Sequence, residues 1–508
     1  MSLSQKISTA LTYNTLRVIL STISSILYSI VVVRWLQIQN FGGYAFLDSL
    51  FSILGVIYLL GSHPPVLRFI PEFVVKRDYC RLRTLISKLQ IINLFGSLTA
   101  TFLILISTDV FLTIFGKPEL AFYARLMALG IIPAAVLGIT KNMLIATYEQ
   151  KFLSIFETFF SFLQLFLLIM FVLFLDMELT GVIITSLVNN IIAATIYSIY
   201  IRRKHPYLFK GEKIAINTGF SWRVIKYTLP LTALDLINKF TSYAGNIFLG
   251  AYRNLKELAY FDISNSFADR VFSQIWLLIG SLGIVSLSEA SFDAAKFKLA
   301  LQQYMKIILL YTLPVAMGGI IIAEPLLVIL YGEKALPSVE IFRILLPAHC
   351  FLNIFGTASM ILNVKEKTYL LLLGGAFRSL MIILLGLWLI PPLGINGTIL
   401  STILPSIIVT IYYTYFIIFK AKIGNFIPLR AMGKYFASSL FMGIIVVFLV
   451  HFLHTNRLWI LFSSLIVGPL TYVLALRSIG AFDQTDKRIF MSMKVPFKSI
   501  ILKLLWKD

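Results

Sequence analysis

Residues 222–270 read WRVIKYTLPLTALDLINKFTSYAGNIFLGAYRNLKELAYFDISNSFADR. Two apolar segments, each long enough to cross a bilayer, flank the polar turn at residues 253–257. The ionisable residues inside them are Asp235, Lys239, Asp262, Asp269 and Arg270. Such groups are costly in hydrocarbon, so we expect them to face a protein interior or a water-filled cavity. The alternative is that Asp235 and Lys239, one helical turn apart, only neutralise each other.

The same apolar character extends over the whole chain of 508 residues. Hydrophobic residues make up 58% and charged residues 13%, and the mean hydropathy is +0.88. Apolar runs long enough for a membrane helix recur throughout, which predicts an all-α polytopic membrane protein. Fourteen transmembrane helices are expected near residues 12–34, 44–64, 86–107, 120–145, 152–175, 179–201, 224–251, 257–286, 303–323, 338–362, 368–390, 395–419, 432–452 and 458–479.

The net charge of +21 follows from membrane topology. Loops after even-numbered helices hold twenty lysines and arginines, whereas loops after odd-numbered helices hold six. By the positive-inside rule, the even-numbered loops and both termini are cytoplasmic. This predicts a multi-pass protein of the cell (inner) membrane and gives no reason to expect a nucleic-acid partner.

An internal repeat is indicated by matches at one offset. Tyr44 and Tyr260 are 216 positions apart, as are Gly181 and Gly397, and Glu149 and Glu366 are 217 apart. Six helices separate the members of each pair, so the repeat is parallel and predicts two six-helix lobes around a central cleft. The expected domains are residues 1–205, residues 206–423, two extra helices in 424–480, and a cytoplasmic tail at 481–508.

The tail is expected to form a basic amphipathic helix. Phe497, Ile500, Ile501, Leu504 and Leu505 follow helical spacing, and lysines are interleaved between them. Such a helix lies on a bilayer with anionic headgroups. The alternative is a merely solvated basic tail.

Four basic residues fall deep inside spans: Arg17, Lys239, Arg270 and Arg378. An arginine fork suits phosphate oxygens, so we expect these residues to bind an anionic substrate. The alternatives are pairing to a carboxylate on another helix, for Arg270 and Arg378, and snorkelling to the inner interface, for Arg17. No Walker-type loop and no long catalytic loop occurs, so the chain is not expected to be an enzyme.

Four carboxylates are candidates for coupling to an ion gradient. These are Asp235, Asp262, Asp269 and Glu157, each inside an expected span. Intramembrane carboxylates commonly carry protons or sodium ions in transporters. H⁺ and Na⁺ are therefore the candidate coupling ions, and no catalytic metal or organic cofactor is expected.

Three short motifs resemble elements of oligosaccharide flippases. Residues 34–44 read RWLQIQNFGGY, similar to the element after their first helix, with Gln37 where glycine is usual. Tyr331-Gly332 and residues 343–345 (RIL) resemble the region around their tenth helix. Residues 389–398, LIPPLGINGT, are similar to their Ile-Pro-x-x-Gly-Ile-x-Gly-Ala turn, with Thr398 in place of alanine.

The resemblance implies the polysaccharide-transport branch, which includes O-antigen and related repeat-unit flippases, of the multidrug/oligosaccharidyl-lipid/polysaccharide (MOP) exporter superfamily. It implies the MATE-like two-lobe fold, a polyprenyl-pyrophosphate-linked oligosaccharide as substrate and other polysaccharide-assembly proteins as partners. Transport would run from the cytoplasmic to the outer leaflet by alternating access. The alternative functions are a cation-coupled multidrug exporter of the same superfamily, a glycan polymerase and a scaffold protein.

Overall fold

A computed structural model describes residues 3–59, 63–212, 218–290, 293–365, 367–420, 426–452 and 456–482. Every regular element in these ranges is a helix. The helices are α1 Leu3–Trp35, α2 Ile38–Tyr58, α3 His63–Lys76, α4 Tyr79–Ile114, η1 Pro118–Leu120, α5 Ala121–Leu129, α6 Ile131–Ala146, α7 Gln150–Leu168, η2 Ile169–Phe174, α8 Glu178–Lys204, η3 Pro206–Leu208, α9 Thr218–Tyr252, α10 Leu255–Ala290, α11 Ala294–Ile321, α12 Ala323–Tyr331, η4 Glu333–Ala335, α13 Leu336–Val364, α14 Thr368–Leu393, α15 Ile395–Tyr415, η5 Phe416–Lys420, α16 Leu429–Phe452 and α17 Arg457–Ser478.

The prediction of an all-α polytopic membrane protein is confirmed. In the described part of the chain, twelve helical segments are long and apolar enough to cross a membrane. The other two predicted spans correspond to α9 and α10, which are 35 and 36 residues long and therefore about 50 Å in length. Between them, these two helices carry Asp235, Lys239, Asp262, Asp269 and Arg270.

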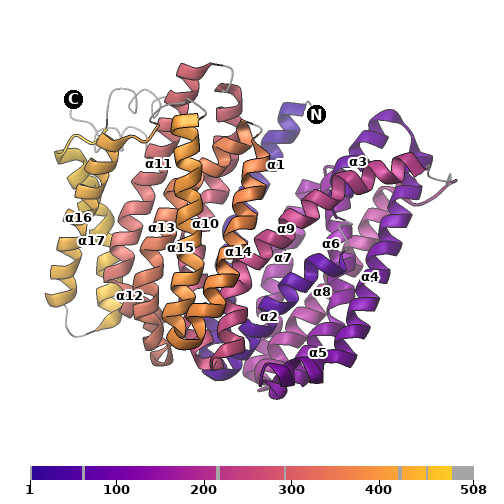
Figure 1. Cartoon of the computed structure of the whole chain (residues 1–508), viewed down its shortest axis with the longest axis horizontal. Coiled ribbons are helices and arrows are strands. Elements are labelled where there is room, and N and C mark those ends of the chain that lie inside the picture. Colours follow the sequence, from indigo (N-terminus) through magenta and orange to yellow (C-terminus); the bar gives the residue numbers. More distant parts are fainter. Residues whose placement is uncertain are drawn as a thin grey trace. The chain divides into compact units, whose positions relative to one another are not determined.

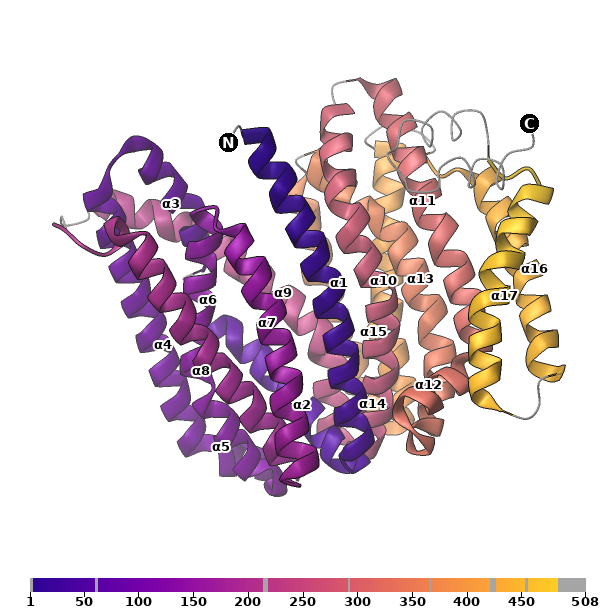
Figure 2. The ribbon, with the colours of Figure 1, turned by 180° about the vertical axis from the view of Figure 1, so that it is seen from behind.

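The helices form two compact units. Unit 1 comprises residues 1–259 together with residues 390–394. Within it, α1 packs along α7, α2 packs against α9, and α6 packs against both α4 and α8 (Figure 2). A large apolar cluster between α3, α4, α6, α7 and α8 includes fully buried Phe69, Ile70, Leu82 and Ile201. This cluster holds the helices at one end of unit 1 in fixed positions.

Unit 2 comprises residues 260–389 and residues from 395 onward. Its α11 packs against α13 and α16, α16 packs against α17, and α13 packs against α15 (Figure 1). Tyr472 of α17 donates a hydrogen bond to the carbonyl of Leu310 in α11 at 2.9 Å. The two helices outside the predicted repeat, α16 and α17, are thus an integral part of unit 2.

The compact units and the predicted lobes are defined by different criteria. Contacts place α9 in unit 1, whereas the predicted repeat begins its second lobe at residue 206. The parallel repeat and its boundaries therefore stay a prediction. The predicted amphipathic helix at the C-terminus lies outside the described residues.

The glycines of two flippase-like motifs have steric roles in unit 1. A Cβ on Gly42 would lie 1.8 Å from the carbonyl oxygen of Leu255, so α2 approaches the start of α10 at backbone distance. Gly394 has a φ of +55° and lies against Arg253 and Glu257, where a Cβ would be 2.6 Å from a Glu257 oxygen. A side chain at either position would force these segments apart.

Prolines lie inside several of the long helices. These are Pro230 in α9, Pro314 in α11, Pro347 in α13 and Pro405 in α15. The predicted span at residues 120–145 is two helices, α5 and α6, that meet at Gly130 just before Pro133. Proline supplies no amide donor to the preceding turn, which explains the break.

Candidate functional site

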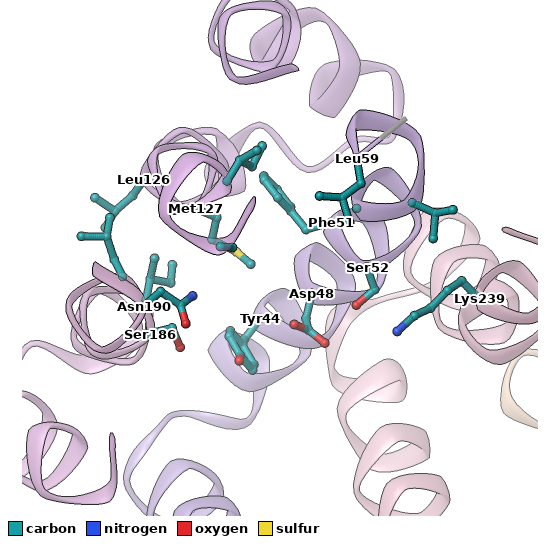
Figure 3. A pocket seen from close by; sticks show the side chains of 17 residues that line it. Tyr44, Asp48, Phe51, Ser52, Leu59, Leu126, Met127, Ser186, Asn190 and Lys239 are labelled. Carbon is teal, nitrogen blue, oxygen red and sulfur yellow. The ribbon is translucent and has the colours of Figure 1, made fainter. Parts of the chain in front are cut away.

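A cavity of about 460 Å³ lies in unit 1 between α2, α5, α6, α8 and α9 (Figure 3). Its polar lining comes from Tyr44, Asp48 and Ser52 of α2, Ser186 and Asn190 of α8, and Lys239 of α9. The remaining lining is apolar and includes Phe51, Leu126 and Met127. We call this the unit-1 cavity. Its two charged residues, Asp48 and Lys239, have opposite signs.

Lys239 reaches the cavity because α2 and α9 are fixed to each other. Next to Asp48, Ser49 accepts a buried hydrogen bond from the Asn246 amide of α9 at 3.1 Å. Figure 3 shows the Lys239 ammonium pointing toward Ser52 and Asp48. Tyr243, one turn along α9, places its ring centroid 5.5 Å from the ammonium. The aromatic face therefore stabilises the cation without neutralising it.

The alternative in which Asp235 and Lys239 neutralise each other is not seen. Both side chains are exposed. Neither forms an ion pair within the described ranges, although they are one turn apart on α9. Lys239 is therefore available to a ligand in the cavity. Asp235 is an exposed carboxylate with no described structural role.

Asp48 is a cavity residue that the sequence analysis did not single out. It lies ten residues from each end of α2, or about 15 Å, so it is at the middle of a membrane span. The expected span at residues 44–64 placed it only four residues from one end, because α2 begins at Ile38, six residues earlier than expected. Together with oxygens of Tyr44, Ser186 and Asn190, its carboxylate offers hard ligands suited to a proton or a small cation.

Arg17 and Glu157 form an ion pair between α1 and α7. Lys141 of α6 adds a second cation, whose ammonium lies 2.5 Å from the other Glu157 oxygen. One predicted substrate residue is thus the partner of one predicted coupling residue. Two cations around one carboxylate leave a net positive charge. The hydroxyl of Ser24 extends the α1–α7 contact by donating to the Ser161 carbonyl at 2.7 Å.

Arg378 is the only charged residue of α14 and lies about 15 Å along the helix from Thr368. Its Nε is buried and has no hydrogen-bond partner. No ion pair involves Arg378 among the side chains that the structure describes. Tyr413 of α15 lies within electrostatic range. Its hydroxyl donates to backbone carbonyls of α14 at 3.2 and 3.3 Å, however, and a neutral phenol supplies no counter-charge.

The other predicted residues of unit 2 lie along α10. Arg270 is half-buried and forms no ion pair with any described residue, so the adjacent Asp269 does not neutralise it. Asp269 is exposed and lies near His349 of α13. Asp262 is half-buried and accepts a hydrogen bond from Ser266 at 3.4 Å. The predicted residues are thus divided: Arg17 and Lys239 in unit 1, and Arg270 and Arg378 in unit 2.

A second cavity, of about 510 Å³, lies in unit 2 and is almost wholly apolar. Its walls come mainly from α11, α13, α16 and α17, and include Pro314, Gly318, Leu346, Met442 and Pro469. We call this the unit-2 cavity. Its size and chemistry suit a hydrocarbon chain and exclude a charged group without a partner.

No cluster of three or more His, Cys, Asp or Glu side chains able to hold a metal ion occurs in the described ranges. The ionisable groups occur instead as single residues or small ion pairs inside spans. This pattern is typical of a transport pathway.

The family model described as polysaccharide biosynthesis protein matches residues 31–340, which is more than half of the chain. This chain belongs to that family. This family agrees with the polysaccharide-transport proteins that the motifs resemble. No curated protein sequence matches the chain.

Solved structures confirm the predicted MOP fold. The inward closed conformation of the lipid II flippase MurJ is similar with a TM-score of 0.68 at 16% identity, covering 92% of this chain and 97% of MurJ. An inward-facing multidrug resistance MATE transporter of the MOP superfamily gives 0.67 at 16% identity, over 79% and 94% of the two chains. A MOP superfamily transporter from Pyrococcus furiosus gives 0.56 at 16% identity, over 82% and 95%.

Proposed function

We propose that this protein is a flippase that moves a polyprenyl-pyrophosphate-linked oligosaccharide from the cytoplasmic to the outer leaflet of the cell membrane. The product would serve the assembly of a surface polysaccharide such as an O-antigen. Membership of the polysaccharide biosynthesis family supports the glycan, and the fold supports alternating access between two lobes.

The observation that carries this proposal is that the buried Nε of Arg378 has no hydrogen-bond partner. A guanidinium near the middle of a membrane span, with a buried Nε and no acidic partner in the described structure, is costly to maintain. Pyrophosphate oxygens accept from a guanidinium in two-point contact and so supply the missing partner. Lys239 and Arg270, also without ion pairs in the described ranges, extend the set of cations available to the substrate.

The unit-2 cavity supports a lipid carrier. A polyprenyl chain is purely hydrocarbon, and about 510 Å³ of apolar space would accommodate part of it out of contact with water. Burial of each CH₂ group contributes about 0.8 kcal/mol. In this proposal the unit-2 cavity holds part of the lipid, while the basic residues hold the pyrophosphate.

In this proposal Arg17 binds the substrate only after it has separated from its present partner, Glu157. Its guanidinium is bound to Glu157, so a substrate phosphate must replace that carboxylate. The ion pair thus links the predicted coupling residue to the predicted substrate residue. Asp48 joins Asp235, Asp262 and Asp269 as a further candidate for coupling to H⁺ or Na⁺.

The second candidate function is a cation-coupled multidrug exporter. Asp48 in the unit-1 cavity favours it, because a carboxylate at mid-membrane attracts a cationic drug. The basic residues that form no ion pair in the described ranges argue against it, since each would repel such a drug. The exporter predicts that Asp48→Asn abolishes drug resistance while surface glycan stays normal.

Deletion of the protein in its native cell distinguishes the two functions. The flippase proposal expects loss of surface glycan and accumulation of the lipid-linked precursor in the cytoplasmic leaflet. Re-expression of the wild type should restore the glycan, whereas Arg378→Gln at equal membrane abundance should not. Normal glycan after deletion, combined with increased drug sensitivity, would instead assign the exporter.

A further inference from the structure

A polar slot lies in unit 1, apart from the unit-1 cavity, between α4, α6 and α8. Its volume is about 300 Å³. The polar lining consists of Ser87, Gln90, Asn93, Ser97, Thr140, Ser198 and Arg202, and no acidic residue is part of the lining. Along α4 the lining runs from Ser87 to Ser97, which corresponds to about 15 Å. The slot therefore extends from the basic end of α8 into the span.

The inner part of the slot contains a polar atom without a partner. Asn93 is 2% exposed, and its Nδ2 donates to the Ala135 carbonyl at 2.8 Å. Its Oδ1 is buried and accepts no hydrogen bond. An unsatisfied buried acceptor costs about 1–3 kcal/mol. A ligand with a hydroxyl donor at this point would recover that free energy.

The outer part of the slot contains an arginine without a carboxylate. The Arg202 guanidinium lies 5.7 Å from the ring centroid of Phe209 and forms no ion pair with any described side chain. The loop carrying Phe209 is fixed by Arg83, which donates to the carbonyls of Tyr207 and Glu212 at 3.0 and 3.1 Å. Arg202 and Phe209 are thus preorganised before any ligand binds.

Two apolar side chains of α4 in the lining are exposed. Ile91 and Leu94 are 63% and 46% exposed and lie within a membrane span. These side chains would contact acyl chains of a surrounding lipid. The slot therefore has a cation at its outer end and hydroxyl and amide groups further in. A hydrocarbon surface adjoins these groups.

We propose that the slot binds the headgroup of an anionic phospholipid that carries free hydroxyls, of the phosphatidylglycerol type. The phosphodiester meets Arg202, a glycerol hydroxyl donates to Asn93 Oδ1, and the acyl chains lie along Ile91 and Leu94. This is a structural lipid site, separate from the transported substrate and independent of the proposed flippase activity.

Native mass spectrometry of the purified full-length protein in phosphatidylglycerol nanodiscs tests the site. The wild type should retain a phosphatidylglycerol adduct that phosphatidylcholine does not replace. Arg202→Gln and Asn93→Leu should each weaken retention about tenfold or more, because each removes a hydrogen bond to a buried or charged group. Ser198→Leu, which fills the slot, should have the same effect and covers the case in which Asn93→Leu does not fold.

Lys210→Gln is the matched control, since Lys210 is an exposed neighbouring cation outside the lining. It should leave retention unchanged. An equal loss of lipid retention in Lys210→Gln would show that retention depends on general surface charge, and it would overturn the site. Retention that survives in both Arg202→Gln and Ser198→Leu would also overturn it. Saturation by soluble glycerol 3-phosphate, with no preference for the lipid, would overturn the lipid assignment.

Discussion

Arg17 of α1 and Glu157 of α7, 140 positions apart in the sequence, form a direct ion pair in unit 1. Lys141 of α6 shares the same carboxylate. The three residues link α1 to α6 and α7, which lie far from it in the chain. They also make the availability of Arg17 depend on the charge of Glu157.

The first prediction concerns this ion pair. Glu157→Gln should lower the free energy of unfolding by about 1–3 kcal/mol, because it removes the charge-assisted hydrogen bond from Arg17 and leaves two cations without an anion. A thermal unfolding assay in detergent measures the change. The double variant Arg17→Gln/Glu157→Gln should be less destabilised than the sum of the single variants. Strict additivity would show that the pair contributes no coupling energy.

The second prediction concerns Arg378. Arg378→Gln should reduce glycan export at least about tenfold, because the charge proposed to bind pyrophosphate is lost. Arg378→Lys should give an intermediate rate, since an ammonium keeps the charge but not the two-point geometry. Surface glycan relative to membrane abundance is the measurement. Arg203→Gln, at the exposed end of α8, should behave like wild type. Equal export by Arg378→Gln and wild type would exclude a role for Arg378 in substrate binding.

The third prediction concerns the opposite charges of the unit-1 cavity. Lys239→Gln should weaken binding of a short-chain pyrophosphate-linked sugar, and Asp48→Asn should strengthen it. One charge at about 10 Å in an effective dielectric of about 20 contributes roughly 1.7 kcal/mol, or about one order of magnitude in Kd. Isothermal titration with the purified protein measures both changes. A shift in the same direction for both variants would argue against direct electrostatic contact with the ligand.

The fourth prediction concerns the unit-2 cavity. A Cβ on Gly318 would lie 3.5 Å from the terminal methyl of Met442, an ordinary contact, so Gly318→Leu should fill the cavity without moving the backbone. Export of the long-chain substrate should fall, while binding of a short-chain analogue should be unaffected. Gly433→Leu on α16, where an added Cβ meets nothing within 4 Å, is the control. Loss of short-chain binding in Gly318→Leu would indicate misfolding rather than a blocked lipid site.

The fifth prediction concerns Glu149, which lies between α6 and α7 outside the spans. Burial opposes ionisation of this carboxyl, but hydrogen bonds from Lys204, His205 and Tyr200 outweigh it and hold its pKa below the usual value of 4.5. The stabilisation is therefore complete above pH 4.5 and is lost as the pH falls through the lower, folded-state pKa. The stability difference between wild type and Glu149→Gln should be constant from pH 8 to about 5 and shrink in more acidic buffer. A difference that grows on acidification would contradict this sign.

The sequence predicts the spans well because each is a long apolar run, and hydrocarbon allows few alternatives to a helix. It predicts the interruption at Gly130 less well, since a short break leaves the mean hydropathy unchanged. The ion-pair partners of charged residues are still harder to predict from the sequence. The Glu157 carboxylate is shared by Arg17 and Lys141 because of how α1, α6 and α7 are rotated and packed, and no local pattern encodes that arrangement.

Two functional candidates show the same limit. Asp48 lies at the middle of α2, but the expected span at residues 44–64 placed it near an end, so its depth was not recognised. Asn93, by contrast, is an ordinary polar residue in an apolar helix. Its significance depends on an Oδ1 that the fold leaves without a donor. Sequence reasoning therefore locates charges inside the membrane, whereas the structure shows which of them are already neutralised.

Reconstitution tests the central claim most directly. The purified protein is placed in proteoliposomes that contain a polyprenyl-pyrophosphate-linked oligosaccharide, and the appearance of glycan in the opposite leaflet is followed with an impermeant lectin or glycosidase. The account predicts translocation by the wild type and little above the protein-free rate for Arg378→Gln. Translocation by Arg378→Gln at the wild-type rate, or none by a folded wild type under any H⁺ or Na⁺ gradient, would contradict it.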